Sequence, residues 1–160
     1  AIPGVAGLEH RIGGLEKQDG SGNVSHESEN HHKMTKLRQE KVDRISQEIS
    51  KTKITGDGSG DLLILSWGGS SGASRSATDQ LQDEGLSVSH VNIRWINPLP
   101  NDLEGILKKF KHVLIPEINN GQLIKIIRAE YLIDAIGYNI VRGKPLRASL
   151  IVEKVKEIIG

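Results

Sequence analysis

The apolar positions of this chain are unevenly distributed, and most aliphatic clusters lie after residue 60. In that part, short continuous apolar runs alternate with stretches in which apolar side chains recur every three or four residues. The first pattern predicts buried strands, and the second predicts helices with one face on a core. The predicted strands are 62–67, 88–93, 113–116 and 138–141, and the predicted helices are 73–84, 103–110, 122–135 and 149–159, the last one capped by Ser149.

This regular alternation of strands and helices predicts the fold class. Strand–helix–strand units form right-handed crossovers, which make the strands parallel and place the helices on the faces of the sheet. We therefore expect residues 61–160 to form one α/β domain with three layers, in which a mostly parallel sheet is flanked by helices.

Residues 1–30 form a different kind of segment, an extended connector rich in glycine. Six glycines among the first 22 residues break this stretch into turns, and 18–23 is compatible with the turn of a small hairpin. Such a stretch buries too little apolar surface to fold by itself. We therefore expect it to lie against a neighbouring domain, to which His10 and Arg11 would be hydrogen-bonded.

Residues 31–60 are predicted to link the connector to the domain. A basic amphipathic helix capped by Ser28 or Asn30 is expected to end near Lys51, and the composition of 55–60 is typical of a flexible linker. The main domain boundary is therefore placed at residue 60. The apolar side chains of the helix follow helical spacing, at Met34, Leu37, Val42, Ile45 and Ile49.

Composition and charge exclude several classes of function. The 21 basic and 20 acidic residues leave a formal charge of +1, and only 3% of the residues are aromatic. Nucleic-acid binders and membrane-surface proteins need a basic excess on one face, so neither partner is expected. No apolar run approaches the roughly 20 residues of a membrane span. No secretion signal is visible and Ala1 stands in place of Met, so we expect a cytoplasmic protein whose chain starts inside a longer one.

Metal binding and nucleophilic catalysis find little support in the sequence. The chain has no cysteine, which excludes thiolate ligands for an iron–sulfur cluster or for zinc. His26, His31 and His32 are close in sequence, but the last two are adjacent and cannot face the same way on a helix. No serine lies in a nucleophile elbow. We therefore predict no metal site and no catalytic residue.

Three loops that follow strands hold the polar side chains of interest. The carboxyl ends of parallel strands meet on one side of a sheet, where open α/β domains bind ligands. The first loop, 68–72, offers backbone and hydroxyl donors at the start of a helix, although a tight turn explains its glycines equally well. In the second loop, Arg94 fits either a bidentate anchor for a phosphate or carboxylate, or a rigid corner fixed by two prolines.

The third loop, 117–122, favours a contact surface because its side chains are polar. A lone glutamate in such a loop, here Glu117, is more often a partner of a helix N-terminus than a catalytic acid. The candidates for ligand or interface contacts in the three loops are therefore Ser70, Ser71, Gly72, Arg94, Asn97, Glu117, Asn119 and Gln122.

Four motifs, in this order, resemble a known family. Residues 7–32, 63–73, 91–100 and 113–132 resemble the C-terminal part of the α subunit of 2-oxoacid:ferredoxin oxidoreductases, in particular of the 2-oxoglutarate type. The resemblance covers essentially the whole chain, and it departs from the common pattern at 69–71 and at Asn120. The spacing of Arg94 and Pro98 is shared, more loosely, with transketolase C-terminal domains.

The resemblance implies an enzyme that decarboxylates a 2-oxoacid on thiamine diphosphate, passes electrons through an iron–sulfur cluster to ferredoxin and releases acyl-coenzyme A. It also implies that the upstream α domain holds the pyrimidine of thiamine, and that the β subunit holds the diphosphate, the Mg (magnesium) ion and the cluster. Residues 61–160 would then be a transketolase C-terminal-like domain, and residues 1–30 the tail of the pyrimidine-binding domain.

In such a heterodimer, this segment would serve subunit assembly and the access of coenzyme A, without binding a cofactor alone. Two alternatives stay open at this point. The chain could be the C-terminal domain of another thiamine diphosphate enzyme, or a non-catalytic α/β docking module.

Overall fold

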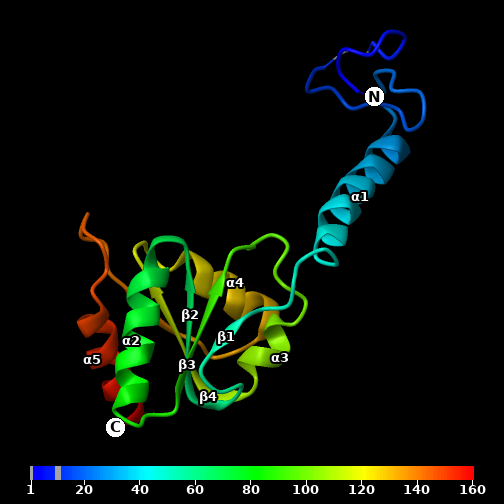
Figure 1. Ribbon diagram of the computed structural model, residues 1–160. Coiled ribbons are helices and arrows are strands. Elements are labelled where there is room, and N and C mark those ends of the chain that lie inside the picture. Colours follow the sequence, from blue (N-terminus) through cyan, green and yellow to red (C-terminus); the bar gives the residue numbers. More distant parts are fainter. Residues whose placement is uncertain (1, 10–11) are drawn as a thin grey trace. The chain divides into compact units, whose positions relative to one another are not determined.

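The computed structural model describes residues 2–9 and 12–160, so the predicted contacts of His10 and Arg11 lie outside the described residues. The chain divides into two compact units, residues 1–45 and 46–160. The first unit, blue to cyan in Figure 1, contains a glycine-rich arm followed by α1 (Ser28–Ile45). The second unit contains all the other helices and strands.

The arm contains the predicted hairpin. Lys17 and Val24 form an antiparallel bridge. The amide of Gln18 donates a hydrogen bond to the carbonyl of Asn23 at 2.7 Å, and the amide of Gly22 donates to the carbonyl of Gln18 at 3.0 Å. Gly22 has a φ of 74°, which a glycine adopts without strain. The turn composition therefore predicted this local structure correctly.

Charged side chains tie the hairpin to α1. The Glu16 carboxylate accepts hydrogen bonds from both terminal nitrogens of Arg38, at 2.9 and 3.1 Å, and its Oε2 lies 2.7 Å from Nδ1 of His31. The hydrogen bonds from Arg38 first, and from His31 second, lower the pKa of Glu16 to about 2. A cluster of charged groups therefore orders the hairpin on the helix where little apolar surface is buried.

The bounds of α1 differ from the prediction. Asn30 lies inside the helix and does not cap it, because its side chain donates to the carbonyl of Lys17 and accepts from the amide of Asp19. The helix ends at Ile45 instead of near Lys51. None of its residues is buried.

The second unit is built on a five-stranded sheet with the order β1–β3–β2–β4–β5. Four strands are parallel, and β1 runs antiparallel to β3. The mostly parallel sheet of the predicted α/β fold is thus confirmed. The strands are β1 (Ile54–Thr55), β2 (Gly60–Trp67), β3 (Val88–Ile93), β4 (Phe110–Glu117) and β5 (Ile136–Asn139).

Helices cover both faces of this sheet, as Figure 1 shows. Leu62 and Ile64 of β2 pack under α2 and α5, whereas Leu63 and Leu65 pack under α3 and α4. Because β2 is buried on both faces, its sequence is a continuous apolar run. The helices are α2 (Ser71–Asp83), α3 (Leu103–Leu107), α4 (Gln122–Tyr131) and α5 (Ala148–Ile159), and a short 3-10 turn, η1 (Gly68–Ser70), precedes α2.

Some element ends differ from the predicted ones for local reasons. Helix α4 ends at Tyr131, because Leu132 adopts a left-handed conformation with a φ of 53° that does not continue a helix. The fourth predicted strand is β5, which spans 136–139 instead of 138–141. Ser149 is the second residue of α5 and does not cap it.

A segment that the sequence predicts as helix end and linker belongs to the second unit. This docked segment (residues 46–53) is fastened at Thr52, whose amide and hydroxyl donate to the carboxylate of Asp102 at 2.8 and 2.6 Å. Asn101 Nδ2 also donates to the carbonyl of Ser46 at 3.1 Å. These bonds lead the chain into β1 beside β3. None of the described helices is long and apolar enough to cross a membrane.

Candidate functional site

The carboxyl ends of β2 and β4 are neighbours, and the chain leaves them in opposite directions. Helix α2 follows β2 onto one face of the sheet, and α4 follows β4 onto the other. Open α/β sheets commonly bind ligands at such a divergence. Here the protein's own side chains occupy it. Trp67 Nε1 donates to Glu117 Oε1 at 3.2 Å, and a Cβ added at Gly69 would lie 3.3 Å from Cδ1 of Ile118.

Glu117 supports this region from inside, with 1% of its surface exposed. Besides Trp67, its Oε1 accepts hydrogen bonds from Asn119 Nδ2 at 3.1 Å and from the amide of Leu123 at 2.9 Å. Its Oε2 accepts from the amide of Ile124 at 3.2 Å. The carboxylate therefore caps the first turn of α4, where free amides favour a negative charge.

The other two candidates of this loop have different positions. Asn119 Oδ1 accepts hydrogen bonds from the amides of Gly121, at 2.8 Å, and Gln122, at 2.9 Å, so it shares the capping of α4. Gly121 has a φ of 78°, and a Cβ there would come within 2.9 Å of Asn139 Nδ2. Gln122 is exposed at the start of the helix. Gln122 is thus the most exposed of the three candidates in this region, and the one most accessible to a partner.

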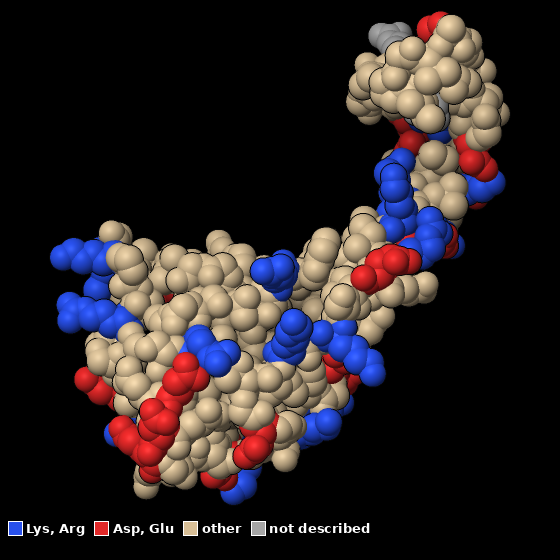
Figure 2. Space-filling model, viewed as in Figure 1, with Lys and Arg blue, Asp and Glu red and all other residues tan. Residues whose placement is uncertain are grey.

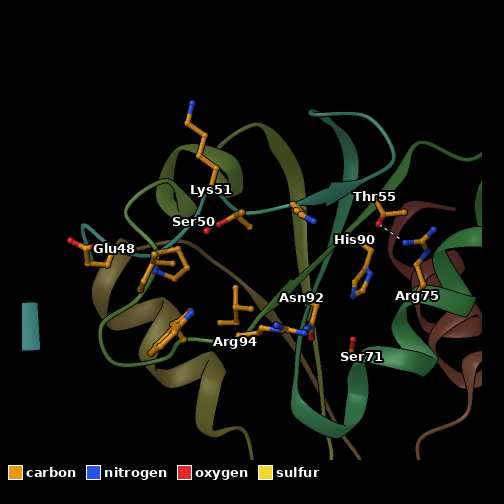
Figure 3. A pocket seen from close by; sticks show the side chains of 15 residues that line it. Glu48, Ser50, Lys51, Thr55, Ser71, Arg75, His90, Asn92 and Arg94 are labelled. Carbon is orange, nitrogen blue, oxygen red and sulfur yellow. Dashed lines mark hydrogen bonds between the residues drawn. The ribbon is translucent and has the colours of Figure 1, made fainter. Parts of the chain in front are cut away.

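The loop after β2 contains one buried serine, Ser70, and residues that are accessible to a ligand. Ser70 is 1% exposed, and its Oγ donates to the carbonyl of Trp67 at 3.0 Å. Ser71 is half-buried at the first position of α2 and lines a cavity, whereas Gly72 is exposed. The hydroxyl of Ser71 is therefore the one in this loop that faces a space for a ligand (Figure 3).

Arg94 and Asn97 are both exposed after β3. Arg94 lines the same cavity as Ser71, and Asn97 lies outside its lining. The peptide bond between Asn97 and Pro98 is cis. Within the described residues Arg94 forms no ion pair, so its guanidinium keeps its donors for another group. The sequence predicted only that the loops of Arg94 and Ser71 lie on the same side of the sheet. The structure shows that both residues line one cavity.

The cavity has a volume of about 620 Å³, within the range of small-molecule sites. Its walls come from the docked segment, the start of α2, the end of β3 and the turn that follows, as Figure 3 shows. Thr55 of β1 closes one side. The polar residues of the lining are Glu48, Ser50, Lys51, Thr52, Lys53, Thr55, Ser71, Arg75, His90, Asn92 and Arg94.

A buried polar network underlies this cavity. His90 Nε2 lies 2.7 Å from Oγ of Ser66, and the same Oγ is 3.1 Å from Oδ1 of Asn92. The burial of His90, which is 4% exposed, and secondarily the charge of Arg75 lower its pKa to about 4. His90 is thus neutral at pH 7. Sequence reasoning missed it, because nothing in the sequence VSHVNI of β3 distinguishes a buried histidine from an exposed one.

The described part of the chain holds no group of three or more His, Asp or Glu side chains placed to bind a metal ion. His31 is engaged with Glu16, and His26 and His32 are exposed. The arrangement around the cavity combines cations, hydroxyls and a neutral imidazole, which suits the binding of an anion.

The family follows from comparison with known proteins. The family model of the pyruvate:ferredoxin oxidoreductase core domain II matches residues 60–143, more than half of the chain. The chain belongs to this family. The matched range contains the whole of β2 to β5 and the cavity residues from Ser71 to Pro100, whereas the cavity residues from Glu48 to Thr55 lie outside it.

Relatives of this core domain II chain confirm the resemblance to 2-oxoacid oxidoreductases. The 2-oxoglutarate oxidoreductase subunit KorA of Mycobacterium tuberculosis is 42% identical over 144 residues, which are 89% of this chain and 22% of that subunit. The 2-oxoacid:ferredoxin oxidoreductase subunit alpha of Saccharolobus solfataricus is 26% identical over 150 residues, 90% of this chain and 24% of the relative.

Solved structures agree with this family. The 2-oxoglutarate:ferredoxin oxidoreductase from Magnetococcus marinus, with 2-oxoglutarate, coenzyme A and succinyl-CoA bound, matches with a TM-score of 0.91 and 33% identity over 100% of this chain and 28% of that chain. A split-gene transketolase, 17% identical with a TM-score of 0.54 over 68% of this chain and 41% of that chain, shows the shared transketolase-like fold. The core domain II chain thus spans about a quarter of the length of its oxidoreductase relatives.

Proposed function

We propose that this chain is the C-terminal part of the α subunit of a 2-oxoglutarate:ferredoxin oxidoreductase. The enzyme oxidatively decarboxylates 2-oxoglutarate, transfers the acyl group to coenzyme A and reduces ferredoxin in the cytoplasm. The observation that carries the proposal is the 42% identity to the KorA subunit over 89% of the chain. The choice of oxoacid is supported by the Magnetococcus marinus enzyme, which has a TM-score of 0.91 and binds 2-oxoglutarate, coenzyme A and succinyl-CoA.

In this proposal the chain does not hold the cofactors. Thiamine diphosphate, magnesium and an iron–sulfur cluster would supply the decarboxylation and electron-transfer chemistry of the holoenzyme. The residues present do not fit these groups, because the chain has no cysteine and its described residues contain no cluster of metal ligands. The proposal assigns them to the β subunit and the upstream α domains.

The chain instead contributes contacts for assembly and for the access of coenzyme A. Arg94 and Asn97, on the loop after β3, and Gln122, at the start of α4, are exposed, so their polar groups can meet the β subunit or the coenzyme. In the arm, large apolar side chains are exposed, as expected for a surface covered by the upstream α domains. These side chains are Ile2, Val5, Leu8, Ile12 and Leu15.

The activity of the assembled enzyme tests the proposal. The full-length α subunit that carries this segment, produced together with its β subunit, is expected to reduce ferredoxin only when both 2-oxoglutarate and coenzyme A are present. Succinyl-CoA formation measured by mass spectrometry should match the amount of reduced ferredoxin. Pyruvate in place of 2-oxoglutarate serves as the matched control and should support much slower turnover.

Two outcomes would contradict the proposal. Assembly with a lipoamide-dependent partner, and no ferredoxin reduction, would identify another thiamine diphosphate enzyme. Binding of thiamine diphosphate to this 160-residue chain alone that is much tighter than the binding of inorganic pyrophosphate would contradict the placement of the cofactor in the other domains.

A further inference from the structure

The cavity beside β3 has a strong excess of positive charge. Lys51, Lys53, Arg75 and Arg94 line it, and among the described lining residues Glu48 is the single acid. The whole chain, by contrast, has a formal charge of only +1. Figure 2 shows Lys and Arg side chains over the middle and upper part of the second unit in this view, and acidic ones toward its lower left. The excess of positive charge is therefore a property of the cavity lining and not of the whole chain.

Three of these cations keep their charge available. Lys51, Lys53 and Arg94 form no ion pair within the described residues. Lys51 extends outward in Figure 3 and so lies at the rim. An anion in the cavity would thus meet donors that no carboxylate of the second unit neutralises, and charge-assisted hydrogen bonds of this kind are the strong ones.

Arg75 is held in place beside the cavity. Its Nε donates to Oδ1 of Asp79 at 3.0 Å, and its NH1 donates to Oγ1 of Thr55 at 2.9 Å, a bond that Figure 3 draws. Side chains fixed before binding lose less conformational entropy when a ligand arrives. The guanidinium therefore provides a preorganised part of the lining.

Neutral donors and a neutral floor complete the lining. Ser71, the first residue of α2, lines the cavity, so its hydroxyl is a further donor there, while its amide already donates to the carbonyl of Gly68. Asn92 adds a side-chain amide. Buried His90 lies beneath them and is uncharged at pH 7, so the positive charge of the lining comes from its lysines and arginines. Cations, hydroxyls and amides around one concave space are the groups that bind phosphate oxygens.

We propose that this cavity, between the docked segment, the start of α2 and the end of β3, binds the phosphate groups of a phosphate ester or diphosphate. Lys53 and Arg94 supply the charge, and Ser71 supplies a hydroxyl donor. The binding site is built from this chain's own second unit. It therefore does not depend on the proposed oxidoreductase activity, although coenzyme A, which carries phosphate groups, would be its ligand in that enzyme.

Titration calorimetry on the 160-residue chain tests the site with sodium pyrophosphate, ADP, coenzyme A and citrate. Pyrophosphate and ADP are expected to bind with micromolar affinity, and citrate, an anion without phosphate, much more weakly. Tighter binding of coenzyme A than of ADP would identify the coenzyme as the source of the phosphate, and tighter binding of ADP would identify a nucleotide. The fluorescence of Trp95, which lines the cavity, gives a second readout.

The double variant Lys53→Gln with Arg94→Gln should weaken pyrophosphate binding by at least about tenfold, because two charge-assisted hydrogen bonds are lost. Its matched control is Lys125→Gln with Arg142→Gln, which removes one exposed lysine and one exposed arginine outside the cavity lining. Ser71→Ala, a change that leaves the net charge unaltered, should weaken binding several-fold.

Equal affinity of the cavity variant and the control variant for pyrophosphate, or citrate binding as tight as pyrophosphate binding, would overturn the proposal. If the assembled wild-type enzyme shows no oxidoreductase activity while the chain still binds pyrophosphate, only the proposed function is contradicted.

Discussion

Glu117 is a charged residue whose four hydrogen-bond donors all come from its own chain. They link the end of β2, through Trp67, to the first turn of α4, through the amides of Leu123 and Ile124. Sequence reasoning placed this residue in the loop after the strand, whereas it is the last residue of β4; the expected role as a partner of a helix N-terminus is the one observed. The contact with Trp67 could not be predicted, because it depends on which strands are neighbours in the sheet.

The effect of Glu117 on stability is open to measurement. We expect Glu117→Ala to lower the free energy of unfolding by about 2–4 kcal/mol, because buried donors lose their acceptor. Glu117→Gln, which keeps one acceptor oxygen, should cost less. Urea unfolding of the chain measures both values. Asn120→Ala, an exposed change in the same loop, is the control and should alter stability by less than about 0.5 kcal/mol. An equal loss in Glu117→Ala and Asn120→Ala would rule out the capping role.

His90 makes stability depend on pH. Burial and the charge of Arg75 lower its pKa from 6.5 to about 4, so the unfolded chain binds a proton between these values while the folded chain does not. Stability is therefore expected to fall as the pH decreases from about 6.5 to 4, by on the order of 2 kcal/mol after allowance for solvent screening near Arg75.

Urea unfolding of the wild-type chain and of His90→Gln at several pH values between 7.5 and 4 measures this loss. Carboxylates titrate in both chains, so the difference between the two stability curves reports His90 alone. Both chains contain the surrounding residues Arg75, Asp79 and Ser66. His112→Gln, at a less buried histidine in β4, is the control. Parallel curves for wild type and His90→Gln would show that His90 is not kept neutral by the fold.

Among the elements, the sequence pattern predicted the buried strands β2, β3 and β4 and the helices between them, but it extended the helix 103–110 too far, because α3 ends at Leu107 and Phe110 begins β4. These elements can be predicted because each is defined by the spacing of apolar residues that are close together in the sequence. Strand β1 was missed, because two residues, Ile54 and Thr55, are too short a run to show a period. The end of α1 was also misplaced, since the bonds between Thr52 and Asp102 join residues far apart in the chain.

The candidate site was predictable only in outline. Its loops follow from the rule that parallel strands end on the same side, which places Ser71 and Arg94 near each other. The cavity itself needs the docked segment and β1. It also needs the register that pairs Ile64 with His90 and Ser66 with Asn92. Such register is fixed by packing between distant residues, and no periodicity in a single strand reveals it.

For the whole molecule, the position of the core predicts which part folds by itself. Every buried apolar side chain of the described residues lies between Leu62 and Val155. We therefore expect residues 46–160 to unfold cooperatively in urea, with a midpoint close to that of the whole chain. Residues 61–160, the domain predicted from composition, serve as the comparison. They lack Ile54, which packs on the core, and the bonds of Thr52 to Asp102, so they should be less stable by about 2 kcal/mol or more.

Circular dichroism and the urea midpoint of the two truncated chains decide between the boundaries. Equal stability of residues 46–160 and 61–160 would show that the docked segment and β1 contribute little. A non-cooperative transition for residues 46–160 would show that the first unit is required for folding.

Strand β1 also determines how this sheet can associate with other chains. An uncovered outer strand presents unpaired amides and carbonyls that can template a further strand, and this is a common route to aggregation. Here β1 lies antiparallel on β3, pairing Ile54 with Val91 and Thr55 with His90. Gly56, with a φ of 94°, then turns the chain away after two residues. Strand addition is thereby blocked on the side of the cavity, and β5 is left as the side from which another chain could extend the sheet.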